Sequence, residues 1–234
     1  MTRGELLTVL APSKAVGRQP KSSVGRNCLI TGPAGSGKLS LVRAFTAALY
    51  PRARQFLLDW EVEPSVQQDQ LDQLRIRGSN PRRQEIWILR RLDRASPACL
   101  SSALSVCRDA CTASDRPGQV IFATALDTDV IQVQVNASAL FPWRVSLAGL
   151  PRDRRALERV TLEILAELDQ QYGRRISTLD SAVVDLLLRH RWVAHFRELV
   201  NIVERAYFRE PTASLTVRTF ENLGLDRLAS QRAH

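Results

Sequence analysis

A glycine-rich segment between an apolar run and an amphipathic stretch constrains this sequence more than any other feature. The segment, residues 32–38, reads GPAGSGK. The run before it, NCLIT at 27–31, is mostly apolar and ends at a glycine, which predicts a buried strand. The stretch after it, 38–50, carries apolar residues at helical spacing and stops at Pro51, which predicts a helix. A strand, a glycine turn and a helix in this order point several backbone N–H groups into one concavity, where a phosphate group binds.

The residues of this loop have separate roles in the predicted phosphate site. Gly32, Gly35 and Gly37 allow the backbone to turn tightly and to approach a phosphate closely. The Lys38 ammonium reaches the β- and γ-phosphates as a point charge. We therefore expect ATP or ADP to be bound by the loop and its flanking residue, that is, by Gly32, Pro33, Ala34, Gly35, Ser36, Gly37, Lys38 and Leu39.

One position departs from the usual phosphate loop. The residue after the lysine is normally Ser or Thr, whose hydroxyl ligates magnesium, and here it is Leu39. Ser40 follows, but its side chain points about 100° away around the helix. The sequence therefore predicts phosphate binding and leaves the participation of Mg²⁺ open.

Strand and helix patterns alternate along the first two thirds of the chain. Such alternation predicts a parallel sheet flanked by helices. Strands are expected at 27–31, 55–59, 85–89 and 119–124, with a candidate fifth at 143–147, and helices at 38–50, 65–75 and 97–111.

The pattern changes after Pro151 to three successive amphipathic helices. They are expected at 152–172, 179–190 and 196–208, with Gly173 ending the first and Thr178 capping the second. The expected fold class is thus α/β, a phosphate-loop parallel sheet followed by a small helical domain. The expected domains are an N-terminal lead-in at 1–24, the α/β core at 25–149 and the helical domain at 150–234.

Bulk composition excludes several classes of protein. No apolar run reaches the roughly 18 residues that cross a bilayer, and no signal-type stretch follows Met1, so a cytoplasmic protein without membrane contact is expected. The formal charge is +9, almost all of the positive charge being arginine, which suits either a DNA-associated protein or an arginine-decorated surface. The cysteines match no zinc spacing and are expected as buried thiols: Cys28, Cys99, Cys107 and Cys111.

Three segments together resemble the ATPase module of bacterial enhancer-binding proteins, the AAA+ activators of sigma-54 RNA polymerase. Residues 29–38 resemble that family's phosphate loop, which also lacks the Ser or Thr after the lysine. Residues 140–154 resemble the stretch that reads roughly DLYYRLNV…LPPLRER. Residues 192–206, WVAHFRELVNIVERA, are similar to the family's WPGNVRELENVIERA, the most specific of the three. The resemblance implies an AAA+ core with a helical lid, in agreement with the patterns above.

The resemblance also implies roles for two arginines. Arg197 falls on the lid arginine, called sensor 2, that touches the terminal phosphates of the nucleotide. Arg144 falls on one of two arginine fingers that reach the site of a neighbouring subunit, and the partner finger falls on Ser138. Thr124 lies beside the sensor 1 position, where Ala125 replaces the family's asparagine. A surface salt bridge is the alternative role for each arginine.

The acids that the family uses for hydrolysis are missing. The family places an Asp-Glu pair directly after the third strand, where this chain has Arg90 and Arg91, with Asp93 displaced. Cations can neither ligate a metal ion nor act as a base. Asp93 itself, or Asp59 or Glu61 from the second strand, is the alternative source of a carboxylate. We therefore expect weak ATPase activity or none, and no catalytic residue is assigned.

Two other parts of the family pattern are not found. The GAFTGA loop that grips sigma-54 has no counterpart in residues 60–80, and only about one helix follows Ala206, where a DNA-binding helix-turn-helix is usual. Direct contact with sigma-54 is therefore not expected. The leading expectation is a non-hydrolysing AAA+ regulatory or assembly protein that associates with itself or with another AAA+ protein. An active ATPase, a DNA-associated accessory protein and a scaffold with an empty pocket are the alternatives.

Overall fold

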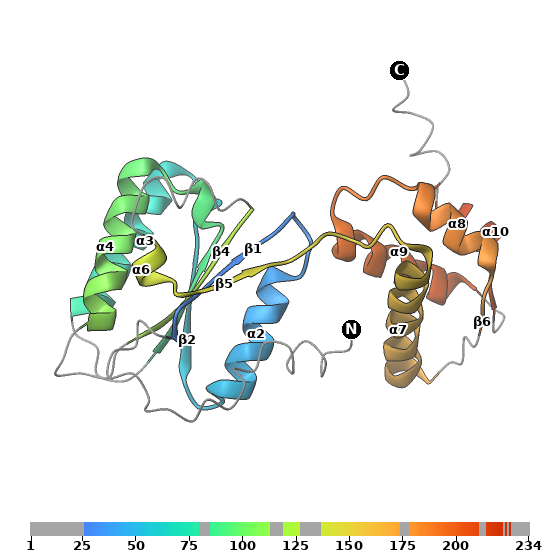
Figure 1. The fold of residues 1–234 in the computed structure, drawn as a ribbon, viewed down its shortest axis with the longest axis horizontal. Helices are drawn as coiled ribbons and strands as arrows, with labels where there is room; N and C mark the ends of the chain where they lie inside the picture. Colours follow the sequence, from blue (N-terminus) through green and yellow to red (C-terminus); the bar gives the residue numbers. More distant parts are fainter. Residues whose placement is uncertain are drawn as a thin grey trace, which may run out of the picture. The chain divides into compact units, whose positions relative to one another are not determined.

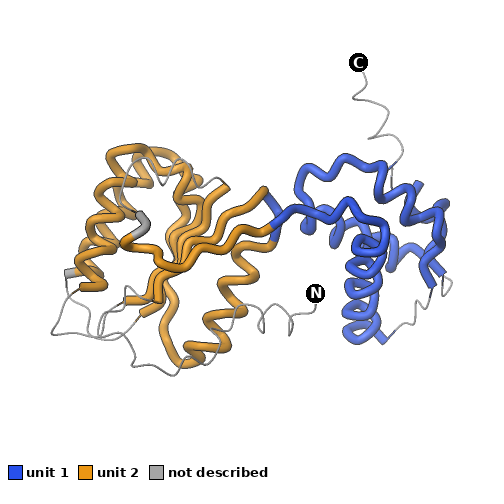
Figure 2. The backbone as a smooth tube through the Cα atoms, viewed as in Figure 1, with its two compact units in different colours: residues 1–12, 34–36, 148–234 blue, residues 13–33, 37–147 orange. Residues whose placement is uncertain are grey.

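The computed structural model describes residues 26–79, 85–112, 119–126, 137–173, 178–210, 214–221, 223 and 225. The expected lead-in lies outside these residues. The chain divides into two compact units (Figure 2). The sheet unit comprises residues 13–33 and 37–147, and the lid unit comprises residues 1–12, 34–36 and 148–234.

The sheet unit is built on five parallel strands in the order β2-β3-β4-β1-β5 (Figure 1). The central strands are buried because their sequences are continuous apolar runs, as expected for a sheet covered on both faces. The predicted parallel α/β fold is therefore confirmed, including the candidate fifth strand. The strands are β1 (Cys28–Thr31), β2 (Arg54–Asp59), β3 (Glu85–Arg90), β4 (Val120–Ala125) and β5 (Trp143–Ser146).

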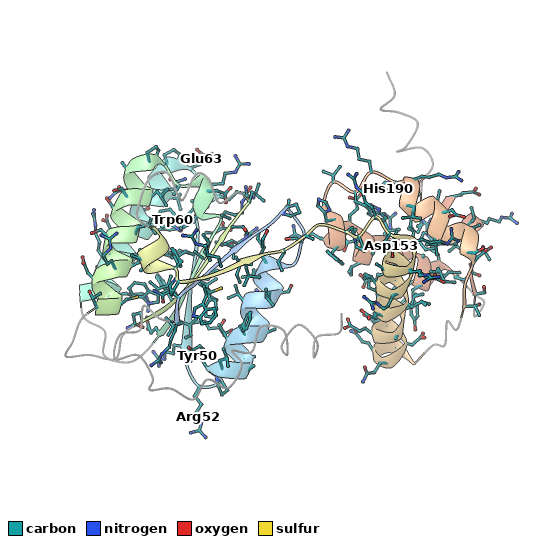
Figure 3. All side chains as sticks on the ribbon, in the orientation of Figure 1. Tyr50, Arg52, Trp60, Glu63, Asp153 and His190 are labelled. Atoms are coloured by element: carbon teal, nitrogen blue, oxygen red, sulfur yellow. The ribbon has the colours of Figure 1, made fainter. Side chains whose placement is uncertain are left out.

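Helices cover both faces of this sheet. α2 (Lys38–Leu49) lies on one face, and α3 (Pro64–Ser79), α4 (Pro97–Thr112) and the short α6 (Ala137–Leu140) lie on the other (Figure 1). A 3-10 turn, η2 (Leu92–Arg94), follows β3. α4 begins as the Ser-Pro pair predicts, since Ser96 Oγ accepts a hydrogen bond from the Cys99 N–H at 3.3 Å. The larger core lies between the sheet and α3 and α4, and Trp87 is fully buried in it. Trp60, labelled in Figure 3, is fully buried there as well.

A buried asparagine joins four elements at the start of the sheet. Asn27 Oδ1 accepts from the Ile121 N–H at 2.8 Å, and Nδ2 donates to Leu140 O at 3.1 Å and to Cys111 Sγ at 3.3 Å. All four cysteines are buried thiols, as expected. Burial raises the pKa of the Cys28 thiol to about 11, and burial together with Cys111 raises that of Cys107. The Cys28 and Cys107 thiols are packing groups, because burial disfavours their reactive thiolates.

The lid unit contains three main helices around its own core. They are α7 (Arg154–Tyr172), α8 (Ser181–Arg189) and α9 (His195–Arg209), followed by α10 (Val217–Glu221). Two short strands, β6 (Thr178–Leu179) before α8 and β7 (Ser214–Leu215) after α9, pair in parallel. The core of the lid unit includes the buried side chains of Leu157, Leu165, Val183, Leu187, Leu199, Val203 and Tyr207.

Helix ends in the lid match one prediction and correct another. Gly173 ends α7 with φ 72°, a left-handed conformation that glycine adopts without strain. Thr178 does not cap α8, because it pairs with Ser214 between β6 and β7. The cap is Asp180, whose carboxylate accepts from the Ala182 N–H at 3.0 Å. Among the described residues, no helix combines the length and the apolar composition that a membrane span requires.

Candidate functional site

The glycine-rich loop follows β1 and has the backbone conformation that its sequence predicts. Gly32, Gly35 and Gly37 have φ values of 141°, 76° and 87°, a region that residues with a Cβ rarely adopt. A Cβ built on Gly37 would meet no atom within 4 Å, so glycine is required there by conformation rather than by space. Gly37 directly precedes α2, whose first N–H groups therefore border the loop.

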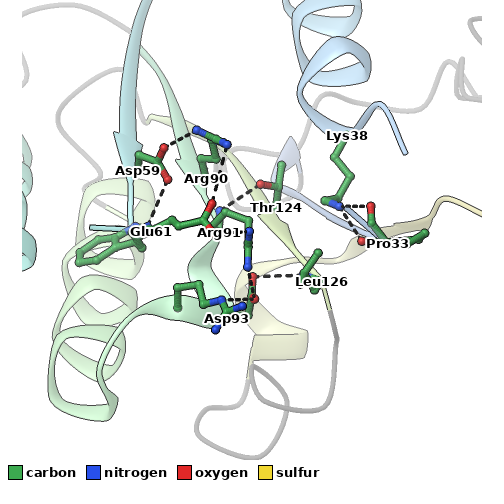
Figure 4. Close-up of polar contacts among 12 residues, drawn as sticks. Pro33, Lys38, Asp59, Glu61, Arg90, Arg91, Asp93, Thr124 and Leu126 are labelled. Carbon is green, nitrogen blue, oxygen red and sulfur yellow. Dashed lines mark hydrogen bonds and ion pairs between the residues drawn. The ribbon is translucent and has the colours of Figure 1, made fainter. Parts of the chain in front are cut away.

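Lys38 folds back over the loop. Its Nζ donates to Gly32 O at 2.5 Å and to Pro33 O at 2.7 Å, and only 8% of the residue is exposed (Figure 4). Ser36 Oγ is buried and has no hydrogen-bond partner within the described parts of the chain. An ammonium and an unpartnered hydroxyl beside a glycine turn can both donate to phosphate oxygens. These residues therefore fit a nucleotide phosphate.

The end of β3 carries arginines that are held by acids from neighbouring elements. The Arg90 guanidinium forms an ion pair with Asp59 at the end of β2, and a longer contact of 3.9 Å with Glu61 (Figure 4). Arg91 Nη1 lies 2.8 Å from Glu61, and Arg91 Nη2 lies 3.5 Å from Asp93. This arginine–acid cluster, defined here as Asp59, Glu61, Arg90, Arg91 and Asp93, lies at and just after the carboxyl ends of β2 and β3.

The cluster is also tied to β4. The Arg91 N–H donates to Thr124 Oγ1 at 3.2 Å, and Arg91 adopts the left-handed conformation with φ 55°. Asp93 Oδ1 accepts from the Leu126 N–H at 3.1 Å, and its side chain is 8% exposed. The carboxyl ends of β2, β3 and β4 are therefore joined by side chains of both charges.

Strand register places the cluster and the loop at the same edge of the sheet. Thr124 pairs with Ile30 in the β1–β4 register, and Ala125 pairs with Thr31, directly before Gly32. In open α/β sheets, ligands bind outside the carboxyl ends of the strands. The predicted phosphate loop and Arg91 are thus brought to one edge, with Thr124 between β1 and β3.

The two remaining predicted arginines are both exposed. Arg144 lies on the edge strand β5, where it pairs with Leu29 in the register, and Arg197 lies in the first turn of α9 in the lid unit. Neither forms an ion pair with another described residue, so the alternative role of a surface salt bridge is not seen there. The side chain of Ser138 is outside the described residues.

Sequence reasoning missed the polar group that builds the turn before Arg197. Glu198 Oε2 accepts from the Val193 and Ala194 N–H groups at 2.9 and 3.0 Å, and Oε1 lies 2.9 Å from His190 Nε2. Burial alone would raise the pKa of Glu198, but these hydrogen bonds outweigh it and hold the pKa below its ordinary value. The signal was present in the sequence, since a glutamate just inside a helix start is a common capping residue.

A strained histidine adds to the same turn. His195 has φ 44°, and its Nδ1 accepts from the Leu150 N–H at 3.2 Å. A Cβ on Gly149 would lie 2.5 Å from that ring, so glycine allows the close approach. The start of α9, which carries Arg197, is thereby fixed within the lid unit by His195 and Glu198.

The fold and the loop together define a class of protein, the phosphate-loop α/β domain followed by a helical lid. Within that class the chain has the AAA+ fold. Residues 152–233 match a family model described as the AAA+ ATPase lid domain. The predicted resemblance to AAA+ ATPases is therefore confirmed at the level of the fold and the lid.

Solved structures agree with this assignment. NtrX from Brucella abortus, in complex with ADP, is 16% identical with a TM-score of 0.63, over 93% of this chain and 52% of that one. The Holliday junction branch migration motor RuvB from Thermotoga maritima is 14% identical with a TM-score of 0.61, over 94% and 66% of the two chains. PCH-2 from C. elegans is 12% identical with a TM-score of 0.54, over 97% and 67%. This chain thus spans about half the length of the NtrX chain. No curated protein matches this sequence.

Proposed function

We propose that this chain is an AAA+ nucleotide-binding protein that binds ATP or ADP with little or no hydrolysis and acts by association with itself or with a partner. One observation carries the proposal. A glycine loop with its lysine in place lies at the same sheet edge as Arg90 and Arg91, which stand where hydrolysis needs acids. NtrX has been solved with ADP and with ATP, which supports the choice of ligand.

The nearby carboxylates do not replace the missing acids in this proposal. Asp59 and Glu61 are paired with the two arginines, and Asp93 accepts a backbone N–H and contacts Arg91. A general base must be free to orient and deprotonate a water molecule. A carboxylate already held in an ion pair with a guanidinium is not free to orient a water molecule, so bound ATP would persist.

Assembly is the second part of the proposal. Arg144 is exposed on an edge strand and lacks an ion-pair partner among the described residues. A permanently charged, unpaired guanidinium suits contact with a phosphate presented by another subunit. We therefore assign Arg144 to a subunit interface and Arg197 to sensing of the nucleotide by the lid. A role in transcription regulation follows only from the resemblance to sigma-54 activators.

Two measurements on one sample test the function. Calorimetry with ATP reports binding, and release of labelled phosphate from ATP reports turnover. Binding without turnover is the expected result, and Lys38→Ala is expected to weaken the binding. An absence of binding would refute the proposal. Steady turnover that Lys38→Ala abolishes would show instead an active ATPase with other acids.

A further inference from the structure

We propose that this site binds nucleotide without Mg²⁺, because the arginine–acid cluster takes the place of the metal-binding groups. The inference rests on the proposed nucleotide binding and specifies its ionic requirement. In a metal-dependent phosphate loop, Mg²⁺ is held by a hydroxyl after the lysine and by a carboxylate at the end of the neighbouring strand. The residues of this chain do not fit that ion at either place.

The first ligand position has no oxygen in its side chain. Mg²⁺ requires oxygen ligands in near-octahedral geometry. Leu39 supplies none, and Ser40 is exposed one step further round α2. The side of the site formed by α2 therefore offers a cation only the backbone and the Lys38 ammonium, which repels it.

The second ligand position for Mg²⁺, at the end of the neighbouring strand, carries two arginines. Arg90 ends β3, and Arg91 follows it in a conformation fixed by φ 55° and by the hydrogen bond to Thr124. Only 11% of the Arg91 side chain is exposed. Moving it aside would leave a buried guanidinium without its acids, which is strongly unfavourable.

The acids within reach are already neutralised. Each carboxylate of the cluster contacts at least one arginine, through Arg90–Asp59, Arg91–Glu61 and Arg91–Asp93. Across the described residues, no group of three or more His, Cys, Asp or Glu side chains is arranged to hold a metal ion. A divalent cation would have to displace a fixed guanidinium from each carboxylate that it used. The geometry therefore excludes the metal and leaves phosphate binding to the loop.

The decisive test compares ADP binding by the full chain with and without the ion. ADP is titrated by calorimetry once in EDTA and once in excess Mg²⁺. The two dissociation constants are expected to differ by less than about threefold. A loss of roughly tenfold or more in EDTA would overturn metal independence while leaving the proposed nucleotide binding intact. No binding in either buffer would overturn both.

A variant then tests whether the arginines are the cause. Arg90→Ala with Arg91→Ala frees Asp59, Glu61 and Asp93 and is expected to make ADP affinity stronger in Mg²⁺ than in EDTA. Arg94→Ala is the matched control, because Arg94 is 57% exposed and reaches Asp93 only at 3.9 Å. It should stay insensitive to the metal. A folded double variant that is equally insensitive would refute the role of the arginines.

If that variant does not fold, Leu39→Ser tests the role of the arginines instead. It restores the hydroxyl but keeps the arginines, and should stay insensitive; a gain of roughly tenfold in Mg²⁺ would refute their role.

Discussion

Arg91 donates its backbone N–H to Thr124 Oγ1 at 3.2 Å, which ties the residue after β3 to the residue of β4 that pairs with Ile30 of β1. This hydrogen bond fixes a cation, rather than an acid, beside β4, the strand that pairs with the one leading into the phosphate loop. The side chain of Arg91 then turns to Glu61 and Asp93. Arg91 therefore joins β4 through its backbone and two carboxylates through its side chain, which is a structural task.

Lys38→Ala should weaken ADP binding by roughly tenfold to a hundredfold, since a charge-assisted hydrogen bond to phosphate is lost. The fold should persist, because Lys38 contacts loop carbonyls and not the apolar core. Calorimetry and circular dichroism measure the two effects. Arg43→Ala, an exposed change on the same helix, is the control. Unchanged affinity in Lys38→Ala would mean that the loop binds no phosphate.

Arg90→Asp with Arg91→Glu should restore the missing acid pair without restoring ATP turnover. The two new carboxylates would join Asp59, Glu61 and Asp93, with both neutralising guanidinium groups removed. We expect a loss of at least about 2 kcal/mol in the free energy of unfolding, because like charges and unpaired acids would then cluster. Chemical denaturation and phosphate release check this. Robust turnover would show that only the acids had been lost.

Glu198→Gln should destabilise the lid near neutral pH and have little effect in acid. The fold lowers the pKa of Glu198 below its ordinary value of 4.5, so its stabilising contribution is complete above that pH. The contribution is lost as the pH falls through the lowered value. Thermal unfolding at pH 7 should shift down by a few °C, and the shift should vanish in acid, once the pH lies below the lowered pKa of Glu198. Glu167→Gln, exposed on α7, is the control. Equal shifts at both pH values would refute the assignment.

Arg144→Ala should weaken self-association without weakening nucleotide binding. ATP is expected to shift the wild-type protein towards larger species, because the exposed guanidinium on β5 would meet the nucleotide of a neighbouring subunit. Light scattering with and without ATP measures the shift, and calorimetry measures binding. If the wild-type protein stays monomeric at high concentration with ATP, self-association is excluded and only assembly with a different AAA+ protein remains.

The fold could be predicted from local sequence patterns because its signals are local. The run ending at Thr31 is apolar and short, and Gly37 and Gly173 lie where the backbone has positive φ. The residues that cap the helices could be predicted less reliably. Thr178 and Asp180 are both capping residue types two positions apart, and the strand pairing of Thr178 with Ser214 decided between them.

The contents of the site could be predicted only in part. The sequence itself gives Lys38, Arg90 and Arg91, but the side chains that the two arginines contact depend on the order of the strands. Glu61 meets Arg91 because β2 pairs with β3 in parallel, and Asn27 meets Leu140 across 113 positions of sequence. No window of sequence contains such contacts, so the neutralised state of the acids appears only in the folded chain.

The pairing of arginines with acids at the strand ends has a consequence for the mutations that this site tolerates. Replacing either Arg90 or Arg91 alone by an acid would leave four carboxylates with one guanidinium, so each such single change should be less stable than the present cluster. A pair of acids after β3 is therefore not reached from this sequence by single substitutions without a loss of stability on the way.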